Sequence, residues 1–206
     1  MIAIVDYGVG NLFSLRSSFA AIGADVAVTG DAAVLRKAER IILPGVGAFG
    51  DAAEKLRRTG LDAAVKAEAA AGKPLLGICL GMQLLFEKSL EYGEHAGLGL
   101  LKGRVVPMEG TLPPQLKIPH IGWNALRYTR PHPLFREVAE GSCVYFVHSF
   151  FVEETASSVT AVAEYGVNVA AAVAKENVLG CQFHPEKSGG VGLRILRAFC
   201  EMEGRA

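Results

Sequence analysis

The first half of the chain alternates short apolar runs with longer segments in which apolar residues recur every three or four positions. The runs at 2–5, 25–28 and 41–43 have the length and composition of buried strands, and residues 12–22 have helical spacing. Buried strands that alternate with amphipathic helices are typical of a parallel sheet covered on both faces. We therefore expect an α/β fold in this half.

Residues 52–87 predict helices, then a strand, and then a further helix that follows the strand directly. Residues 52–71 are rich in Ala, Lys and Glu and are broken only by Gly60, which predicts one or two helices. Residues 75–79 form an apolar run that predicts a buried strand, and residues 80–87 follow at once with helical character. A sharp turn must therefore join the strand to the helix.

The second half is richer in β-type sequence. It contains the runs 104–108, 124–128, 143–151, 158–164, 169–175 and 178–183. Residues 164–168 have the character of a hairpin connection, and residues 191–203 have helical spacing. We expect one domain over residues 1–206, with a central, mostly parallel sheet flanked by helices and with added antiparallel strands in this half.

Composition excludes several classes of protein. The 206 residues include 21 Lys and Arg against 21 Asp and Glu, so the formal net charge is zero, which disfavours a dedicated nucleic-acid binder. With 50% hydrophobic and 20% charged residues the chain is not disordered. This balance indicates a sheet buried on both faces or a surface that a partner covers.

The cysteines and the N-terminus bear on location and metal binding. No CxxC pair is present, and no His, Asp or Glu set has metal-ligand spacing, so we expect neither a disulfide framework nor a metal site. A cytoplasmic location is the simpler interpretation. The N-terminus lacks the basic region of a signal peptide, and no apolar stretch is long enough to cross a bilayer. The cysteines are Cys79, Cys143, Cys181 and Cys200.

One motif, Gly-Ile-Cys-Leu-Gly at residues 77–81, lies where the strand is expected to turn into the helix. It has the form of a nucleophile elbow with Cys79 as the nucleophile, and its glycines permit a tight turn. Unpaired N–H groups at a helix start favour the thiolate of Cys79, and the Leu80 N–H would stabilise an oxyanion. The alternative is a buried structural cysteine.

A second motif offers a base for such a nucleophile. Of the five histidines, only His184 is accompanied by an orienting acid, Glu186. The residue before a proline is held extended, so we expect both side chains to project to the same side. An imidazole held by a carboxylate is the general base of the hydrolytic triads. The alternative is a surface turn.

Two further motifs allow more than one interpretation. Residues 45–50 match the dinucleotide fingerprint G-x-G-x-x-G, but Pro44 follows the strand and no acidic residue lies at the required distance. The same glycines could bring backbone N–H groups to an oxyanion hole. In the apolar run 145–151, His148 is either a core histidine satisfied by Ser149 or part of a substrate-binding strand edge.

Together, Gly77-Ile-Cys-Leu-Gly-Met-Gln83 and His184-Pro-Glu186 resemble the triad-type (class I) glutamine amidotransferases. Segments 6–12, 44–50, 119–124, 145–149 and 180–188 extend the resemblance over most of the chain. The finer pattern is similar to the glutaminase subunits that serve histidine biosynthesis, and one departure is Phe150, where Tyr is expected. The resemblance implies the class I amidotransferase fold.

The resemblance also implies roles for individual residues. Cys79 would attack the side-chain amide of glutamine, His184 would move the proton to the leaving ammonia, and Glu186 would orient His184. The oxyanion hole would be formed by the N–H groups of Leu80 and of Val46 or Gly47, and would be incomplete until the Val46 peptide reorients. The implied glutamine-binding positions are Gln83, His148, Ser149 and Phe150. No cofactor is implied.

The ammonia needs an acceptor, and the pattern leaves no room for a domain that consumes it. Free ammonia would be protonated and lost in water, so we expect the acceptor site on a second chain. In the similar branch this partner is a (β/α)8-barrel cyclase, which forms a heterodimer with the glutaminase. The matching docking positions are Asn11, Trp123, Asn124, Tyr145 and Lys187. Two alternatives stay open: the glutaminase subunit of another amidotransferase, such as pyridoxal phosphate synthase, or a non-catalytic nucleotide-binding module.

Overall fold

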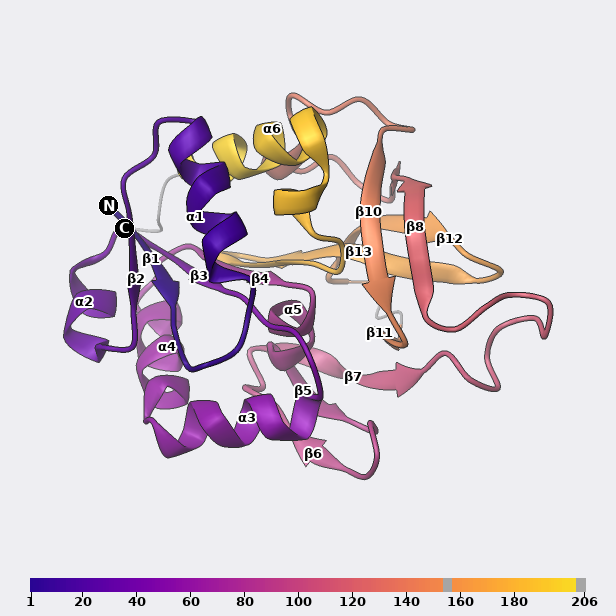
Figure 1. Cartoon of the computed structure of the whole chain (residues 1–206), viewed down its shortest axis with the longest axis horizontal. Coiled ribbons are helices and arrows are strands. Elements are labelled where there is room, and N and C mark those ends of the chain that lie inside the picture. The colour runs from indigo at the N-terminus through magenta and orange to yellow at the C-terminus, as the bar shows by residue number, and fades with distance from the viewer. Residues whose placement is uncertain (154–156, 203–206) are drawn as a thin grey trace.

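The computed structural model of the protein describes residues 1–153 and 157–202, and its largest sheet within them has eight strands (Figure 1). The spatial order is β2 (Val26–Thr29), β1 (Ile2–Val5), β3 (Arg40–Leu43), β4 (Leu75–Ile78), β14 (Val178–Cys181), β13 (Asn168–Lys175), β12 (Val159–Glu164) and β9 (Arg127–Tyr128). Strands β2 to β14 pair in parallel, and β14 to β9 pair in antiparallel fashion. The predicted parallel sheet with added antiparallel strands is confirmed.

Helices cover both faces of this sheet (Figure 1). One face carries α1 (Leu12–Ala21) and α6 (Gly189–Cys200), and the other carries α2 (Ala32–Lys37), α3 (Phe49–Arg58) and α4 (Leu61–Ala70). In β1, Ile2 and Ile4 pack in the core with α1 and α6, whereas Ala3 and Val5 pack in the core with α2, α3 and α4. Burial on both faces explains the uninterrupted apolar runs of these strands.

The remaining strands form two smaller sheets. Strands β8 (His120–Ala125) and β10 (Cys143–His148) make an antiparallel pair. The other sheet has the order β11 (Phe150–Val152), β7 (Leu101–Pro107), β5 (Phe86–Ser89) and β6 (His95–Ala96). Two 3₁₀ turns, η1 (Pro133–Phe135) and η2 (Pro185–Lys187), and the short helix α5 (Leu80–Leu84) complete the described elements.

Several local predictions are confirmed. Two helices occupy the region 52–71, separated by Gly60 in the left-handed conformation with φ 73°. Strands β12 and β13 form the hairpin predicted around residues 164–168. The last predicted helix is α6, which ends at Cys200, and residue 203 of that prediction lies outside the described residues. No helix in residues 1–153 and 157–202 combines the length and the hydropathy needed to span a membrane.

Other predictions are wrong in their boundaries. The helix predicted over 80–87 ends at Leu84, because Phe86 enters β5 and pairs with β7. A short apolar run does not distinguish helix from strand. The run 143–151 divides at Ser149 and the run 124–128 divides at Leu126, since the chain changes sheet at each point.

Helix α2 was not predicted, although its start carries a recognisable signal. The Asp31 carboxylate accepts a hydrogen bond from the Ala33 N–H at 2.7 Å, which caps the first turn. An acidic residue before an apolar segment is a common N-cap. The helix has only six residues, too few to show a helical period clearly.

Candidate active site

The predicted sharp turn is present between β4 and α5. Cys79 has φ 54° and ψ −111°, a left-handed conformation that is unfavourable for a residue with a side chain. A Cβ atom on Gly77 would lie 2.6 Å from the Gly81 carbonyl oxygen, and one on Gly81 would overlap the Leu43 carbonyl. Both glycines are therefore required for the backbone to approach itself closely, as a nucleophile elbow demands.

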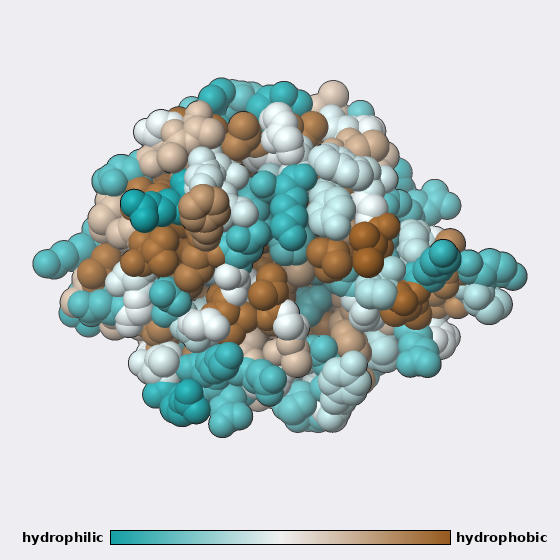
Figure 2. Space-filling model, in the orientation of Figure 1, coloured by the Kyte–Doolittle hydropathy of each residue, from teal (hydrophilic) through white to brown (hydrophobic). Residues whose placement is uncertain are grey.

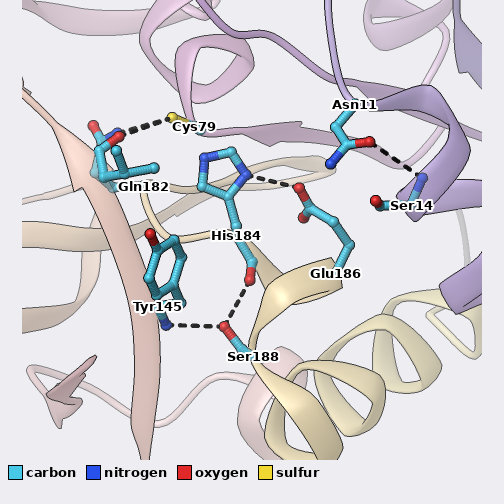
Figure 3. Close-up of polar contacts among 9 residues, drawn as sticks. Asn11, Ser14, Cys79, Tyr145, Gln182, His184, Glu186 and Ser188 are labelled. Carbon is cyan, nitrogen blue, oxygen red and sulfur yellow. Dashed lines mark hydrogen bonds and ion pairs between the residues drawn. The ribbon is translucent and has the colours of Figure 1, made fainter. Parts of the chain in front are cut away.

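The turn presents Cys79 to His184, which in turn contacts Glu186 (Figure 3). His184 Nδ1 and Glu186 Oε1 are 2.7 Å apart, and the side chains are 3% and 1% exposed. Burial alone would lower the pKa of His184, but hydrogen bonds and charge interactions with Cys79 and Glu186 outweigh it and raise the pKa to about 9. The site thus stabilises an imidazolium beside the sulfur.

The pairing of His184 with Glu186 arises differently from the sequence argument. His184 has the expected extended backbone, but Glu186 lies in the 3₁₀ turn η2, which brings the carboxylate back to the ring. Ser188 holds this turn, because its Oγ donates to the His184 carbonyl at 2.6 Å and accepts from the Tyr145 N–H at 3.0 Å. The second oxygen of Glu186 has no hydrogen-bond partner among the described residues.

A second group of polar side chains reaches Cys79 from the other side. Gln182 is fully buried, and its Nε2 lies 3.7 Å from the Cys79 Sγ. Its Oε1 accepts from Gln83 Nε2 at 3.0 Å, and the same Nε2 donates to the Phe150 carbonyl at 3.0 Å. Sequence reasoning missed Gln182; the available signal was its position two residues before His184, because alternate residues of an extended segment face the same side.

His148 lies at the far end of this group. Its Nδ1 donates to the Phe150 carbonyl at 2.9 Å, and its Nε2 is 3.0 Å from His120 Nδ1, whose other nitrogen is 2.8 Å from Asn124 Oδ1. The expected interaction of His148 with Ser149 is not among these contacts, so the simple core interpretation was wrong about the partner.

The two histidines do not carry enough protons for all three contacts. A carbonyl accepts at each end of the pair, so three N–H hydrogens are needed, whereas two neutral imidazoles supply two. Burial lowers the pKa of both rings, that of His148 to about 3. Both are therefore neutral near pH 7, and one of the three contacts lacks a hydrogen.

A cavity of about 320 Å³ opens over the sulfur. Its lining brings together Cys79, His184, Leu80, Val46, Gly47, Gln83, His148, Ser149 and Phe150, and Glu186 lies behind His184. Sequence reasoning missed Glu91, which places a carboxyl group in the lining, is 8% exposed and has its pKa raised by burial. All of the predicted catalytic, oxyanion and substrate positions except Glu186 therefore line one cavity.

Gly45 and Gly50 of the 45–50 loop allow close packing, whereas Gly47 has open space around it and a positive φ of 89°. A Cβ atom on Gly45 would lie 2.9 Å from the Gly81 N, and one on Gly50 would lie 2.7 Å from the His95 ring. The Glu91 carboxylate accepts from the Phe49 N–H at 2.7 Å and so occupies the helix start where a dinucleotide phosphate would bind. The structure therefore disfavours a nucleotide site here. In the described part of the chain, no cluster of His, Cys, Asp or Glu is arranged to hold a metal ion.

Three predicted docking residues form one surface beside the cavity, which we call the docking surface. Trp123 is 55% exposed and meets Tyr145 edge-on at 6.0 Å between ring centroids, and Lys187 Nζ lies 5.8 Å from the Tyr145 ring centroid. Figure 2 shows hydrophobic patches across the middle of the face seen in Figure 1. The other two positions are engaged internally: Asn11 caps α1, and Asn124 Nδ2 donates to the Glu164 carbonyl.

Comparisons with known proteins agree with this arrangement. A family model described as "Glutamine amidotransferase class-I" matches residues 3–202. "Imidazole glycerol phosphate synthase subunit HisH" of Syntrophotalea carbinolica is 48% identical over 206 residues, which cover 98% of this chain and 100% of that protein. The protein of the same name from Caldanaerobacter subterraneus subsp. tengcongensis is 49% identical, with 98% of each chain covered.

Solved structures support the fold. One described as "Crystal structure of glutamine amidotransferase" matches with a TM-score of 0.76 at 20% identity and covers 98% of each chain. PurLQS from Thermotoga maritima matches with a TM-score of 0.75 at 22% identity and covers 97% of this chain and 96% of that one.

Proposed function

This chain belongs to the class I glutamine amidotransferase family, and from that premise we propose that it is the glutaminase subunit of an imidazole glycerol phosphate synthase. It hydrolyses glutamine to glutamate and ammonia, and the ammonia passes to a separate cyclase subunit in histidine biosynthesis. The observation that carries the proposal is the contact series from Cys79 through His184 to Glu186 at the floor of the cavity. Identities of 48% and 49% to two HisH proteins, each over 98% of this chain, support the choice of this synthase.

The first half of the reaction forms a thioester. The Cys79 thiolate attacks the side-chain amide carbon of glutamine, and the Leu80 N–H, with that of Val46 or Gly47, holds the resulting oxyanion. The C–N bond then breaks as the His184 imidazolium gives its proton to the departing nitrogen, which leaves as ammonia. Glu186 keeps the ring oriented and stabilises its positive charge.

The second half regenerates the enzyme. Neutral His184 takes a proton from water, the water oxygen attacks the thioester carbon, and the C–S bond breaks to release glutamate and the Cys79 thiolate. The cavity of about 320 Å³ has the size of a small-ligand site. Lys187 belongs to both the cavity lining and the docking surface, so a partner docked there would lie next to the place where ammonia forms.

The lining also fits the polar ends of glutamine. Both hydrogens of Gln83 Nε2 are already donated within the protein, so Gln83 offers a substrate only its acceptor oxygen. Glu91 places a carboxylate in the lining, which suits the α-ammonium of an amino acid. Ser149 and the backbone beside Phe150 complete the predicted substrate contacts.

The proposed partner is the (β/α)8-barrel cyclase subunit, docked over Trp123, Tyr145 and Lys187. An exposed tryptophan in edge-on contact with a tyrosine is a common anchor of protein interfaces. A single amidotransferase domain in the cytoplasm is consistent with such a heterodimer. The second candidate is the glutaminase of pyridoxal phosphate synthase, which would use the same Cys-His-Glu triad. It predicts that a pull-down captures the synthase subunit of that complex in place of the histidine cyclase.

Replacing the nucleophile tests the function. Glutamate release from glutamine is measured for the purified chain with and without a cyclase subunit, for wild type and Cys79→Ala. We expect Cys79→Ala to lose activity by a factor of about 10³ or more, because the covalent route is closed. Cys143→Ala, which removes an exposed cysteine, should retain the wild-type rate. Glutamate production by Cys79→Ala at the wild-type rate would refute the proposal.

A further inference from the structure

The Cys79 sulfur has a hydrogen-bond donor that the triad does not provide. Gln182 Nε2 lies 3.7 Å from Sγ, within the range of an N–H···S hydrogen bond, and the Gln182 side chain is shielded completely from solvent. The sulfur also lies 3.9 Å from the Val147 carbonyl, which is an acceptor and offers nothing to a thiolate. Besides the imidazole, the carboxamide of Gln182 is thus the group suited to hold negative charge on Sγ.

The direction of the Gln182 amide follows from its neighbours. The Phe150 carbonyl can only accept, so Gln83 must present its NH₂ group to it. The second hydrogen of that NH₂ group then points at Gln182, whose side-chain oxygen must therefore accept it. Because an amide carries its oxygen and its nitrogen on opposite sides of the same carbon, the Gln182 nitrogen is left facing Sγ. A backbone carbonyl therefore fixes the donor at the nucleophile through two glutamine side chains.

We propose that Gln182 is a further catalytic residue, whose amide N–H stabilises the Cys79 thiolate. The inference deepens the proposed glutaminase function and rests on it for its role in turnover. His184 alternates between its charged and neutral forms during each cycle, whereas the Gln182 amide keeps the same hydrogen bond throughout. The thiolate that attacks glutamine, and the thiolate that leaves the thioester, are both held by a donor that never gives up its proton.

The first test measures thiolate reactivity without glutamine. The rate of Cys79 alkylation by iodoacetamide is followed from pH 5 to 10 by peptide-resolved mass spectrometry, which separates Cys79 from the exposed Cys143. In Gln182→Met, a variant of similar length without a donor, we expect the pH at which alkylation reaches half its maximal rate to rise by about one unit. On the acid side of that midpoint alkylation should slow about tenfold, since one unit is a tenfold change in the thiolate fraction.

A matched control separates this effect from general damage to the core. Thr160→Val removes a buried hydroxyl from strand β12, and the Thr160 Oγ has no hydrogen-bond partner in the described structure. It should leave the Cys79 profile unchanged. A folded Gln182→Met protein with the wild-type alkylation profile would overturn the proposal.

The second test needs no substitution of Gln182. Wild-type protein labelled with ¹⁵N is titrated with pH. The side-chain NH₂ resonances of Gln182 should shift with the same midpoint pH as the thiolate absorbance at 240 nm. In Cys79→Ala that shift should vanish while His184 still titrates. If the Gln182 NH₂ resonances do not change as the thiolate forms, the proposal is also overturned. Neither test uses glutamine or a partner, so a failed glutaminase assay with a positive result here would count against the function and not against the Gln182 contact.

Discussion

Two chains of hydrogen bonds meet at the Cys79 sulfur, and they are built from different chemical groups. One runs through His184 to Glu186, both of which ionise. The other runs through the neutral carboxamides of Gln182 and Gln83 to a backbone carbonyl. The first can take up and release a proton, whereas the second can only orient the Gln182 amide toward the sulfur. The comparison separates proton transfer from positioning within a single site.

The chains also end in different places. The ionisable chain ends at a carboxylate whose second oxygen has no partner among the described residues. The neutral chain continues from the Phe150 carbonyl through His148 and His120 to Asn124, on the strand that carries Trp123 of the docking surface. One contact in this continuation lacks a hydrogen, so it fixes the local geometry less firmly than a fully satisfied network would. Perturbing the two chains should therefore give effects of different size and pH dependence.

The largest effect is expected in the ionisable chain. Glu186→Gln keeps the shape of the side chain but removes the charge that stabilises the His184 imidazolium. We expect the kcat for glutamine hydrolysis to fall about a hundredfold, within the range of a general acid–base contribution. Steady-state assays with saturating glutamine and partner test this. A loss below about threefold would remove the distinction between the two chains.

The pH dependence sharpens the same contrast. The pKa of His184 is raised from 6.5 to about 9, so the ring is protonated below that pH and loses its proton as the pH rises through about 9. Glutaminase activity should therefore fall as the pH rises through about 9. The contribution of the paired imidazolium to the free energy of unfolding should be complete below about pH 6.5 and lost as the pH rises through about 9. In Glu186→Gln both transitions should move to lower pH, whereas Gln182→Met should leave the midpoint near pH 9. Pairs of activity profiles and urea denaturation curves measure the two quantities.

The smallest effect is expected at the far end of the neutral chain. His120 stacks on Phe146 and Tyr165 with ring centroids 4.9 and 4.0 Å apart, so His120→Phe keeps the stack and removes the hydrogen bond to His148. Since a neutral hydrogen bond is worth about 1 kcal/mol, we expect kcat to fall about fivefold with little change in KM.

The matched control for this variant lies in the same ring stack. Tyr165→Phe removes a hydroxyl that donates to the Lys117 carbonyl, away from the neutral chain, and should retain the wild-type kcat. An equal loss in both variants would show that the stack supports folding and that the His120 contact has no separate positioning role.

The first half of the fold was predictable because its signals are local. The strands at Ile2–Val5 and Arg40–Leu43 and the two helices around Gly60 follow from runs and periods within about twenty residues. The boundaries failed where an apolar run leaves one sheet for another, as at Ser149, since the partner strand and not the run decides where pairing stops. The same reason explains the shortened helix α5, whose continuation at Phe86 is taken up by β7.

The candidate site divides in the same way. The sequence by itself determined the elbow around Cys79 and indicated Glu186 as the partner of His184, because each involves residues a few positions apart. The 3₁₀ turn that brings the carboxylate to the ring was not predicted, since Ser188 ties it to the distant Tyr145. Only the tertiary structure decided which groups face the sulfur and the cavity: Gln182 lies 103 positions from Cys79, and Glu91 lies 42 positions from the Phe49 N–H that it caps. Periodicity and spacing describe a chain in one dimension, whereas the direction of a buried amide is set by the neighbours that folding brings to it.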